Sequence, residues 1–577
     1  MCGIAGVAGE NYGHHRGREL VRGMIEVQRH RGPDSEGTFA DSHCTLGHRR
    51  LAILDLTVAG AQPMTSTDGR WTIVFNGEIF NYLELREQLG GEFRSGSDTE
   101  VLLRACAEWG VEKALERSVG MYAFGLWDAR ERALTLARDR VGEKPLVYFH
   151  RPGMIAFASE LKALDPFHER RLDPMAMDAY LALGYVPAPL AIFRHCRKLE
   201  PGHLVFYKNG QAELRRWWRP ENARREAPRR SREELIEDLR ARVADAVRLR
   251  LRSDVPVAIF LSGGVDSSII AAECVRQGSK LEAFTADFGD GHPDLEHATL
   301  VARHLGLQQE VLPVDARRSA QDFEKLLWYY DEPFADSSAI PAFALAHELR
   351  GRYRVVLNGE GGDETFGGYR HYERITAKQA IKAAAAAMGF ADGATSVYVE
   401  SKAAFRQEER NCLLNGNGGG NSLSWLLKRE GYRVPKGSAL KKAMWSDRHL
   451  YLPNDLTYKI DIALAASGVE GRAPFLDHRL LEWAQSLPER ELVAGREKKV
   501  LLRDAYRDQL PARVLGRVKQ GFGAPIERWL AGPLRELALE ATPCPLLEAD
   551  RQRNLKGQKL WMMVALAQWA RRWSATW

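Results

Sequence analysis

The chain has 577 residues, and its 82 Lys and Arg residues nearly balance its 76 Asp and Glu residues, which leaves a formal net charge of +6. A domain usually has roughly 100–200 residues, so this length predicts about two to four domains. The small net charge gives little support for a polyanionic partner, and 45% hydrophobic with 27% charged residues excludes global disorder.

The cysteines and the amino-terminal residues indicate the cellular compartment. Seven cysteines with no repeated spacing do not form a disulfide framework, which favours a reducing compartment. No apolar run approaches the roughly 18–20 residues of a membrane-spanning helix. The start of the chain has no basic segment, and its apolar stretch is too short for a signal peptide. We therefore expect a cytoplasmic protein with no membrane partner.

Residues 1–215 are rich in short apolar runs that Gly, Asn and Asp interrupt, such as RWTIVFNGEIFN and YAFGLWDAR. Runs of this kind between turn residues predict strands. Two stretches with helical spacing lie near 17–29 and 97–116. We predict an α+β domain with a large antiparallel sheet component.

Residues 216–233 separate this domain from the rest of the chain. Between 219 and 233 the sequence holds six Arg, two Pro and no aliphatic side chain larger than Ala. An arm that binds nucleic acid is one interpretation, but no aromatic platform accompanies the charges. We favour the other interpretation, a solvated linker.

Residues 234–577 have a different pattern. A helical stretch, LIEDLRARVADAVRLRL, leads into the apolar run VPVAIFL, and the runs LEAFTAD, QQEVLPV and YRVVLNGE follow with helical segments between them. This alternation predicts a parallel sheet with helices on both faces. Residues 370–577 are mostly helical in pattern, and the Gly-rich run at 415–421 marks a variable region within them.

The first candidate site begins at Cys2. If Met1 is removed, Cys2 carries both a thiol and a free α-amine, and an α-amine with a pKa near ~7.7–8.0 is partly neutral at pH 7. The nucleophile and its general base would then belong to one residue. A lone cysteine here would be a coincidence in most proteins, so its neighbours decide. They are the runs HRGPD at 30–34, GHRRL at 47–51, NGEI at 76–79 and SDTE at 97–100, where Ser97 or Asp98 would also serve as a helix N-cap.

The chain resembles the glutaminase domain of the N-terminal-nucleophile amidotransferases, and specifically that of the glutamine-hydrolysing asparagine synthetases. The resemblance rests on five motifs in this order: MCGIAG, RGPD, RLAI, NGEI and SDTE. The resemblance implies a domain of stacked antiparallel sheets with helices over residues 1–215. It implies that Cys2 attacks the glutamine side-chain amide and that the Asn76 amide and the Gly77 N–H stabilise the oxyanion. It also implies that Arg50 binds the glutamine carboxylate, although Arg49 is an alternative, and that Glu78 and Asp98 bind its ammonium group.

The second candidate site is the run SGGVDSS at 262–268, between an apolar strand and a helix. Gly263 and Gly264 let the backbone approach an anion, and the N–H groups at the helix start favour phosphate oxygens. The hydroxyl groups of Ser262, Ser267 and Ser268 add donors. The chain has no Gly followed by Lys-Ser or Lys-Thr at this turn, so transfer of a γ-phosphate is not indicated.

SGGVDSS resembles the PP-loop of enzymes that split ATP into AMP and pyrophosphate, which implies an α/β domain over residues 234–577 with a helical carboxyl-terminal part. Asp266 suits a magnesium ligand. The run NGEGGDE at 358–364 resembles the corresponding family motif, in which Asp363 would be the second magnesium ligand, Glu360 a base, and Asn358 and Gly359 would contact the nucleotide. Leu261 and Ala286 would flank the adenine. Lys499 would neutralise the departing pyrophosphate, with Lys498 as the alternative.

The two sites together predict one coupled reaction. The first would release ammonia from glutamine, and the second would activate a carboxylate as an acyl-AMP, with ATP as a substrate and Mg²⁺ as the metal. The resemblance implies aspartate as the acceptor and asparagine as the product. The run KIDIALAASGVEG at 459–471 departs from the family pattern at Ile462 and Leu464, so a sugar acid or a peptide-linked acid is the alternative acceptor.

Two other classes of protein fit the sequence less well. A PP-loop enzyme that acts on tRNA would need an RNA platform, which the chain lacks outside its Arg-rich linker. A scaffold with inactive sites would be expected to lose Cys2 or the serines of SGGVDSS, and all are present. We therefore expect glutamine, ATP and a carboxylate as small-molecule partners and no nucleic acid. A homodimer is one assembly that the sequence allows.

Overall fold

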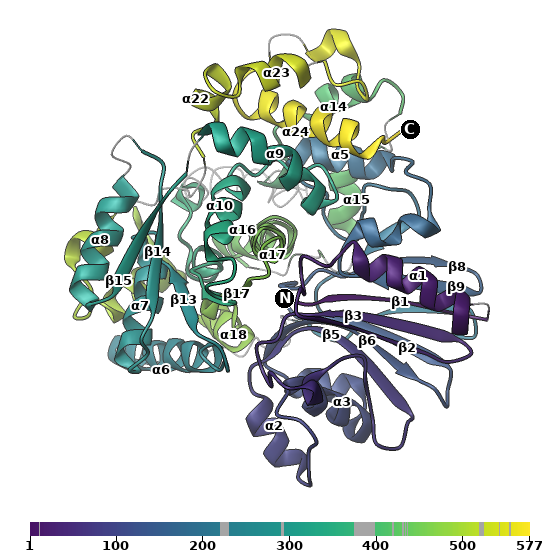
Figure 1. Cartoon of the computed structure of the whole chain (residues 1–577). Coiled ribbons are helices and arrows are strands. Elements are labelled where there is room, and N and C mark those ends of the chain that lie inside the picture. Colours follow the sequence, from purple (N-terminus) through teal and green to yellow (C-terminus); the bar gives the residue numbers. More distant parts are fainter. Residues whose placement is uncertain are drawn as a thin grey trace.

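The computed structural model describes residues 1–10, 12–219, 230–289, 293–314, 316–373, 398–417, 420–429, 432, 434, 437–517, 524–541, 543–552 and 555–577. Figure 1 shows two lobes of strands and helices, one mainly purple and blue and the other teal to yellow. Part of the predicted linker, residues 220–229, lies outside the described residues, and the boundaries at 215 and 234 stay a prediction.

Two six-stranded antiparallel sheets form the amino-terminal lobe, and apolar side chains of both sheets pack between them. The first sheet has, in spatial order, β10 (Cys196–Lys198), β8 (Val147–Arg151), β9 (Met154–Ala158), β1 (Gly3–Gly9), β3 (Cys44–Arg50) and β2 (Ser35–Ala40). The second has β12 (Gln211–Arg216), β11 (His203–Lys208), β7 (Ala133–Arg138), β6 (Gly120–Asp128), β5 (Trp71–Ile79) and β4 (Met64–Thr65).

Helices cover the outer faces of both sheets. Helix α1 (His14–Glu26) lies on the first sheet, as the sequence predicted near 17–29. The helix predicted at 97–116 is two helices, α3 (Asp98–Trp109) and α4 (Val111–Arg117), because Gly110 between them has a φ of +83°. They pack on the second sheet with α2 (Tyr82–Leu89). The stacked antiparallel sheets of the prediction are confirmed.

A five-stranded parallel sheet forms the centre of the second lobe. Its spatial order is β15 (Gln308–Pro313), β14 (Glu282–Asp287), β13 (Val257–Phe260), β16 (Val355–Leu357) and β17 (Glu470–Arg472). β13 pairs with β14 on one side and with β16 on the other. The strand order therefore reverses at β13, and the crevice outside the carboxyl ends of β13 and β16 is the usual ligand site of such a sheet. The parallel sheet was predicted, whereas its edge strand β17 was not.

Helices flank this sheet and form most of the remaining chain, as predicted. Those interleaved with the strands are α6 (Arg232–Arg250), α7 (Val265–Arg276), α8 (Pro293–Leu305), α9 (Ala316–Tyr330) and α10 (Ala339–Leu349). The later ones are α11 (Gly362–Phe366), α14 (Gln407–Leu414), α15 (Ser422–Lys428), α16 (Ala439–Ser446), α17 (Thr457–Ala465), α18 (His478–Ser486), α19 (Glu489–Leu492), α20 (Val500–Ala505), α21 (Ala512–Leu515), α22 (Ile526–Ala531), α23 (Arg535–Ala541) and α24 (Gly557–Trp573).

Several shorter elements complete the chain. A π-helical segment, Asp447–Leu456, joins α16 to α17 without a break. The others are the 3-10 turns Val58–Gly60, Leu161–Phe167, Pro474–Leu476 and Ala549–Gln552, helix α5 (Pro174–Leu183), and the small hairpin of β18 (Val493–Ala494) and β19 (Glu497–Lys498). No described helix is long and apolar enough to cross a membrane.

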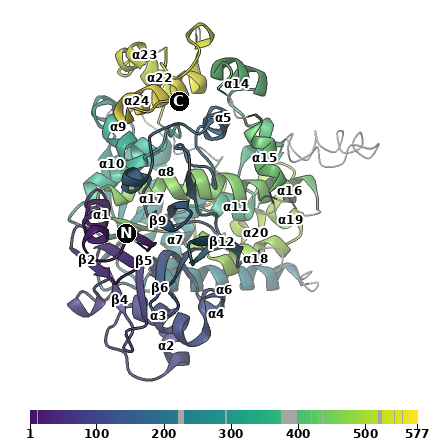
Figure 2. The ribbon, with the colours of Figure 1, turned by 90° about the vertical axis from the view of Figure 1, so that its right-hand side faces the viewer.

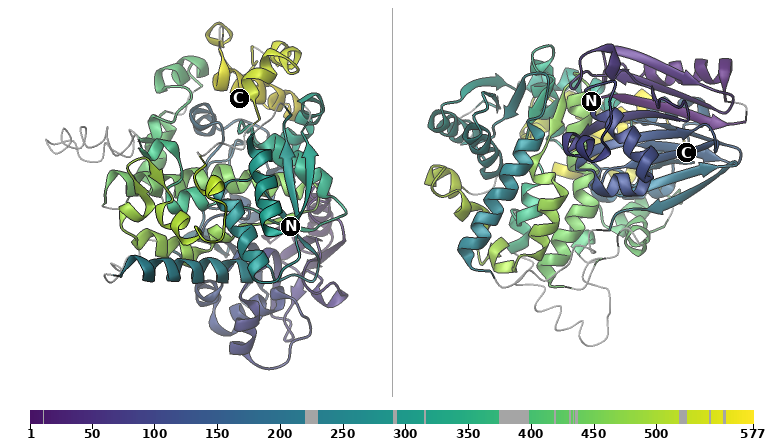
Figure 3. Two further views of the ribbon diagram at one scale, coloured as in Figure 1. Left: turned by 90° about the vertical axis from the view of Figure 1, so that its left-hand side faces the viewer. Right: turned by 90° about the horizontal axis from the view of Figure 1, so that it is seen from below.

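The two lobes share one hydrophobic cluster, which runs from Met1 to Ala575. Helix α24 lies against α9 in the views of Figures 1 and 2, and its Met562 carbonyl accepts a hydrogen bond from Tyr180 of α5 at 2.7 Å. Seen from below in Figure 3, the purple and blue strands lie on one side and the teal and green helices on the other. Buried ion pairs cross this boundary, among them Arg31 with Asp461 at 2.7 Å.

Candidate active sites

Cys2 lies directly before strand β1, at the boundary between the lobes. Its Sγ is 3.9 Å from the Leu51 carbonyl oxygen, and its own carbonyl accepts a hydrogen bond from Arg31 Nε at 3.0 Å. Desolvation raises the pKa of the Cys2 thiol. Met1 is buried beside it, and burial lowers the pKa of the Met1 α-ammonium group to about 6. This amino-terminal pair of residues is thus enclosed by protein.

Strand β5 supplies the two predicted oxyanion donors. Asn76 is fully buried, and its Nδ2 and Oδ1 make no hydrogen bond to the residues that the structure describes. Gly77 has a φ of +146°, and a Cβ atom there would lie 2.0 Å from the Met121 carbonyl oxygen on β6. Only glycine fits this conformation and this spacing. The strand therefore presents an unpartnered amide next to an obligatory glycine.

The structure separates the two candidate arginines of the glutamine carboxylate. Both arginines are buried, but Arg49 lies against α1, where it pairs with Glu26, and it also pairs with Glu36 of β2 at 2.7 Å. Arg50 is near the Cys2 thiol, since its positive charge opposes the rise that desolvation causes in the pKa of that thiol. Its guanidinium donates to the Thr57 carbonyl at 2.7 Å and to those of Leu54 and Asp55, so it also holds the loop over the site.

Glu78 and Asp98 are brought together with a third acid that the sequence analysis did not select. Ser97 is the N-cap of α3, which leaves Asp98 Oδ2 to accept the Ile79 N–H at 2.8 Å. Burial raises the pKa of Asp98 to about 7, and the charge of Glu470 from β17 adds to this shift. Burial also raises the pKa of Glu78 well above its usual range, although Arg472 opposes the rise. Three buried carboxyl groups thus lie close enough to act on one another.

A cavity of about 390 Å³ lies at the carboxyl ends of β13 and β16. Most of the predicted nucleotide and catalytic residues line it. These are Leu261, Ser262, Gly264, Asp266, Ser267, Ala286, Asn358, Gly359, Glu360, Asp363 and Lys499. Gly263 and Ser268 are not in its wall, because Ser268 is buried with its hydroxyl on the Gly264 carbonyl at 2.7 Å and Gly263 packs against Ala298.

Hydrogen bonds among its own residues stabilise the turn that follows β13. The Ser262 and Ser267 hydroxyl groups are 3.0 Å apart, and the Gly264 N–H donates to the Ser262 hydroxyl at 3.3 Å. Gly263 has a φ of +65°, and a Cβ atom there would lie 2.4 Å from the Ala298 N–H nitrogen of α8. The turn therefore needs glycine for its shape, and its serines keep their oxygens at the cavity.

Lys499 links the two carboxylates that the sequence analysis assigned to magnesium. Its Nζ lies 2.7 and 2.5 Å from the two oxygens of Asp266 and 2.5 Å from Asp363 Oδ1. Lys499 has a φ of +54° at the start of α20, a conformation that non-glycine residues adopt rarely. Lys498 also lines the cavity but pairs with Glu373. Of the two lysines, Lys499 is therefore the one between the acids.

Another part of the cavity wall was missed from the sequence. Lys459 of α17 pairs with Asp336 Oδ2 at 3.0 Å, and Tyr369 donates to the carboxylate of Glu364. All four line the cavity together with Tyr451 of the π-helical segment. Glu364 belongs to the run NGEGGDE, but nothing in that run marked it as a residue of the cavity wall, and the sequence analysis assigned no role to Asp336.

Comparisons with known proteins agree with this architecture. Residues 1–218 match the family described as glutamine amidotransferase domain, and residues 238–571 match the one described as asparagine synthase. Asparagine synthetase (glutamine-hydrolyzing) 1 of Bacillus subtilis is 32% identical over 566 residues, which cover 93% of this chain and 89% of that protein. A protein of Gibberella zeae named Amidase chry2 is 29% identical over 93% of this chain and 91% of its own length.

Among solved structures, the glutamine phosphoribosylpyrophosphate amidotransferase of Bacillus subtilis aligns at 16% identity with a TM-score of 0.30, over 54% of this chain and 81% of that one. The fold and the sequence matches define a glutamine amidotransferase domain joined to an ATP-using synthetase domain. The chain belongs to the asparagine synthase family and is an enzyme of its glutamine-hydrolysing type.

Proposed function

We propose that this enzyme transfers the amide nitrogen of glutamine to the side-chain carboxylate of aspartate, with ATP cleaved to AMP and pyrophosphate. The products are then asparagine and glutamate. The matched families and the relatives named asparagine synthetase support the overall chemistry, and the acceptor is the part that we add. The free cysteines and the absence of a membrane-spanning helix among the described residues favour the cytoplasm as the place of the reaction.

The first half-reaction uses the residues around Cys2. After removal of Met1, the α-amine of Cys2 accepts the thiol proton, and the thiolate attacks the glutamine amide carbon. The Asn76 amide and the Gly77 N–H hold the oxyanion, and the unpartnered Asn76 Nδ2 supports this role. Arg50 binds the glutamine carboxylate, while Glu78 and Asp98 bind its ammonium group. Ammonia leaves, and water releases glutamate from the thioester.

The second half-reaction takes place in the 390 Å³ cavity. The acceptor carboxylate attacks the α-phosphorus of ATP, and pyrophosphate leaves with its charge partly neutralised by Lys499. Ammonia then attacks the acyl carbon of the acyl-AMP, Glu360 accepts its proton, and AMP leaves. Leu261 and Ala286 contact the adenine through apolar surface. Asn358 stays near the nucleotide, where its Oδ1 accepts the Glu360 N–H at 3.1 Å.

The donor set suits Mg²⁺ as the metal of this step. Asp266 and Asp363 converge on the Lys499 ammonium group, and this convergence supports their carboxylates as joint ligands of one small cation. The described residues hold no group of three or more His, Cys, Asp or Glu side chains fit for a metal ion. Two carboxylates with phosphate oxygens are the ligands that Mg²⁺ prefers, and a bound Mg²⁺ would offset the phosphate charge.

The connection between the two sites is the observation that carries the proposal. Arg31 bonds the Cys2 carbonyl at 3.0 Å and Asp461 at 2.7 Å, and Lys144 pairs with Asp461 at 3.3 Å. A small cavity of about 10 Å³ is lined by Lys144 and Asp461 on this side and by Asn358 and Glu360 on the other. We propose that ammonia passes along this route, because it would become non-nucleophilic ammonium in water.

The charged residues in the acceptor region of the cavity support an amino acid, such as aspartate, as the carboxylate acceptor. Asp336, Glu360, Glu364 and Lys459 face the cavity together, which offers acids for an ammonium group and one cation for a carboxylate. The alternative is a sugar acid or a peptide-linked acid. Ile462 and Leu464 favour it, because they are buried and leave no second cation at these positions. A relative of similar coverage is named an amidase and not an asparagine synthetase, so aspartate is not the only acceptor to test.

A screen of carboxylate acceptors tests the proposal. The enzyme is incubated with ATP, Mg²⁺ and either glutamine or an ammonium salt, and pyrophosphate and the amide product are measured for aspartate, sugar acids and peptide-linked acids. We expect equal amounts of pyrophosphate and asparagine with aspartate. Pyrophosphate release with another acid and none with aspartate would replace aspartate by that acid, and no release with any acid would contradict the synthetase function itself.

A further inference from the structure

The carboxylate of Glu78 is bound by an arginine from the other lobe. Arg472 Nη2 donates to Glu78 Oε2 at 3.1 Å, and both side chains are buried. Arg472 ends strand β17 of the parallel sheet, whereas Glu78 lies near the end of β5 in the antiparallel sheet. The region around the proposed glutamine site therefore contains a charge that the glutaminase lobe does not supply.

The second oxygen of this carboxylate is open. Glu78 Oε1 is buried and accepts no hydrogen bond from any residue in the described part of the chain. Buried acceptors are seldom left in this state, because a buried oxygen without a partner loses its hydrogen bonds to water and gains none in return. With Oε2 held by the guanidinium and Oε1 open, the carboxylate is oriented to receive one more donor.

Arg472 cannot turn away from Glu78 without losing its other bonds. Its Nε donates to Glu470 Oε1 at 2.8 Å, and its Nη1 donates to the carbonyl oxygens of Arg250 at 3.0 Å and Arg252 at 2.6 Å. A guanidinium presents its donors in a rigid planar fork, so these partners fix its plane. The position of the Glu78 carboxylate is thus set by the backbone of the synthetase lobe.

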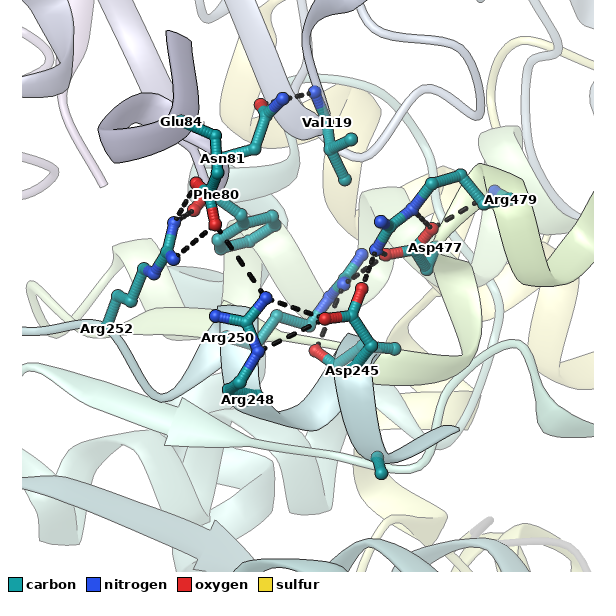
Figure 4. Close-up of polar contacts among 12 residues, drawn as sticks. Phe80, Asn81, Glu84, Val119, Asp245, Arg248, Arg250, Arg252, Asp477 and Arg479 are labelled. Carbon is teal, nitrogen blue, oxygen red and sulfur yellow. Dashed lines mark hydrogen bonds and ion pairs between the residues drawn. The ribbon is translucent and has the colours of Figure 1, made fainter. Parts of the chain in front are cut away.

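The neighbouring contacts hold the end of β5 in the same way, as Figure 4 shows. Arg252 donates to both oxygens of Glu84 at 2.6 Å and to the Phe80 carbonyl at 2.6 Å. Arg250 lies over the Phe80 ring and pairs with Asp477 at 3.1 Å. Phe80 and Glu84 are therefore held by the last residue of α6, Arg250, and by Arg252 just beyond it.

We infer that Arg472 is a positioning residue of the glutamine site, which acts through Glu78 to present Oε1 to the ammonium group of glutamine. The inference rests on the proposed role of Glu78 in glutamine binding and adds the residue that makes this role possible. Recognition of glutamine is then divided between the lobes. The antiparallel sheet supplies the Glu78 carboxylate, and the parallel sheet supplies the arginine that orients it.

The test compares two substrates that differ only in the group that Glu78 would bind. Glutamine carries the α-ammonium group, and glutaric acid monoamide is the same amide without it. Hydrolysis of each is measured without ATP. We expect Arg472→Lys to lower kcat/KM for glutamine by about tenfold or more, mainly through KM, because lysine cannot hold Oε2 and its other partners at once. The value for glutaric acid monoamide should change by less than about twofold.

Arg410→Lys is the matched control. Arg410 of α14 is as buried as Arg472 and donates to a buried carboxylate, that of Asp178, at 2.8 Å, but it makes no bond to β5. The ratio of the two kcat/KM values should stay as in the wild type. Ammonium-dependent pyrophosphate release should persist in Arg472→Lys, which shows that the synthetase lobe is folded.

Glu78→Asp tests the same contact by changing the carboxylate and not the arginine. It replaces Arg472→Lys as the test variant if that variant does not fold. It retains the carboxylate but shortens it away from Arg472, so preference for glutamine over the monoamide should fall again. Equal losses with both substrates, or an unchanged ratio in either variant, would overturn the inference. A wild-type enzyme that hydrolyses no glutamine would instead contradict the proposed function, so the two failures are distinct.

Discussion

Asn76 is an example of a residue whose chemistry conflicts with its surroundings. It is fully buried on β5, and neither polar atom of its side chain has a partner among the residues that the structure describes. A protein that only had to be stable would carry an apolar side chain here, since each open polar group costs about 1–3 kcal/mol. The conflict is resolved if the amide is kept for a charge that develops during the reaction.

Asn76→Ala should therefore separate activity from stability. Glutamine hydrolysis should fall by about 100- to 1,000-fold, because one oxyanion donor is lost. The melting temperature should change by no more than about 2 °C, because the removal of two open polar groups offsets the lost packing. Steady-state kinetics and calorimetry measure the two effects. A large loss of stability with normal hydrolysis would contradict a role in oxyanion binding.

If Asp98 binds the ammonium group of glutamine as proposed, glutamine binding should depend on pH. Burial raises its pKa to about 7, so the carboxyl group is protonated and uncharged at lower pH. A neutral carboxyl group cannot pair with the glutamine ammonium group, so kcat/KM for glutamine should fall by up to about tenfold per pH unit as the pH drops below 7. The monoamide, which has no ammonium group, corrects for titration of other groups. Asp98→Asn should weaken this pH dependence of the ratio without abolishing it, because Glu78 remains and its pKa is also raised.

Residue identities in contiguous runs could be predicted from the sequence, but partnerships could not. The runs NGEI and SGGVDSS carry a strong signal because their members are neighbours in the chain. Arg472 and Glu78 are 394 positions apart, and no local pattern joins them. Lys459 and Asp336 were missed for the same reason, since each is an ordinary charged residue until the fold brings them to one cavity.

At the scale of elements, strand β5 and the short strand β17 together carry several of the charged and polar residues around the proposed glutamine site. β5 carries Asn76, Gly77 and Glu78 in succession, and β17 is a three-residue edge strand that brings Glu470 and Arg472 to them. Long periodic elements such as α6 and α7 could be predicted from the sequence. β17 could not, because three residues have no measurable periodicity and their pairing with β16 is decided by tertiary structure.

Gly77→Ala should damage β5 locally. The backbone has a φ of +146°, and the new methyl group would lie 2.0 Å from the Met121 carbonyl oxygen, so the strand must shift. We expect a loss of about 2 kcal/mol or more in stability and little glutamine hydrolysis, with ammonium-dependent synthesis retained. Gly69→Ala is the control, because Gly69 has a φ of +72° in open space and should cost about 1 kcal/mol. Equal melting temperatures in the two variants would refute this account.

At the scale of the whole molecule, two lobes share one core but hold two separate sites. The hydrophobic cluster from Met1 to Ala575 and the ion pair of Arg31 with Asp461 join the lobes firmly. The predicted residues of each site nevertheless stay within their own lobe. The sequence supported two sites because their motifs are local, whereas the shared core and the crossing ion pairs depend on packing that no motif encodes.

Two complementary variants should show that the sites work independently. Cys2→Ala removes the proposed nucleophile and should lower glutamine use by about 1,000-fold or more, while ammonium salts still support amide formation. Asp266→Asn should abolish pyrophosphate release with either nitrogen source but leave glutamine hydrolysis in place. Assays of glutamate, pyrophosphate and amide for both variants decide the matter. Loss of every activity in Cys2→Ala would contradict independent sites.

The contacts of Arg252 with Glu84 and of Arg472 with Glu78 have a consequence for engineering. A chimaera that joined this glutaminase lobe to the synthetase lobe of a relative would inherit one half of each contact only. Such hybrids would keep the predicted residues of both sites and still use glutamine poorly, unless the residues that make the contacts between the lobes came from the same parent. To exchange the glutaminase domain between relatives, an engineer must therefore also exchange the residues of the synthetase lobe that contact it.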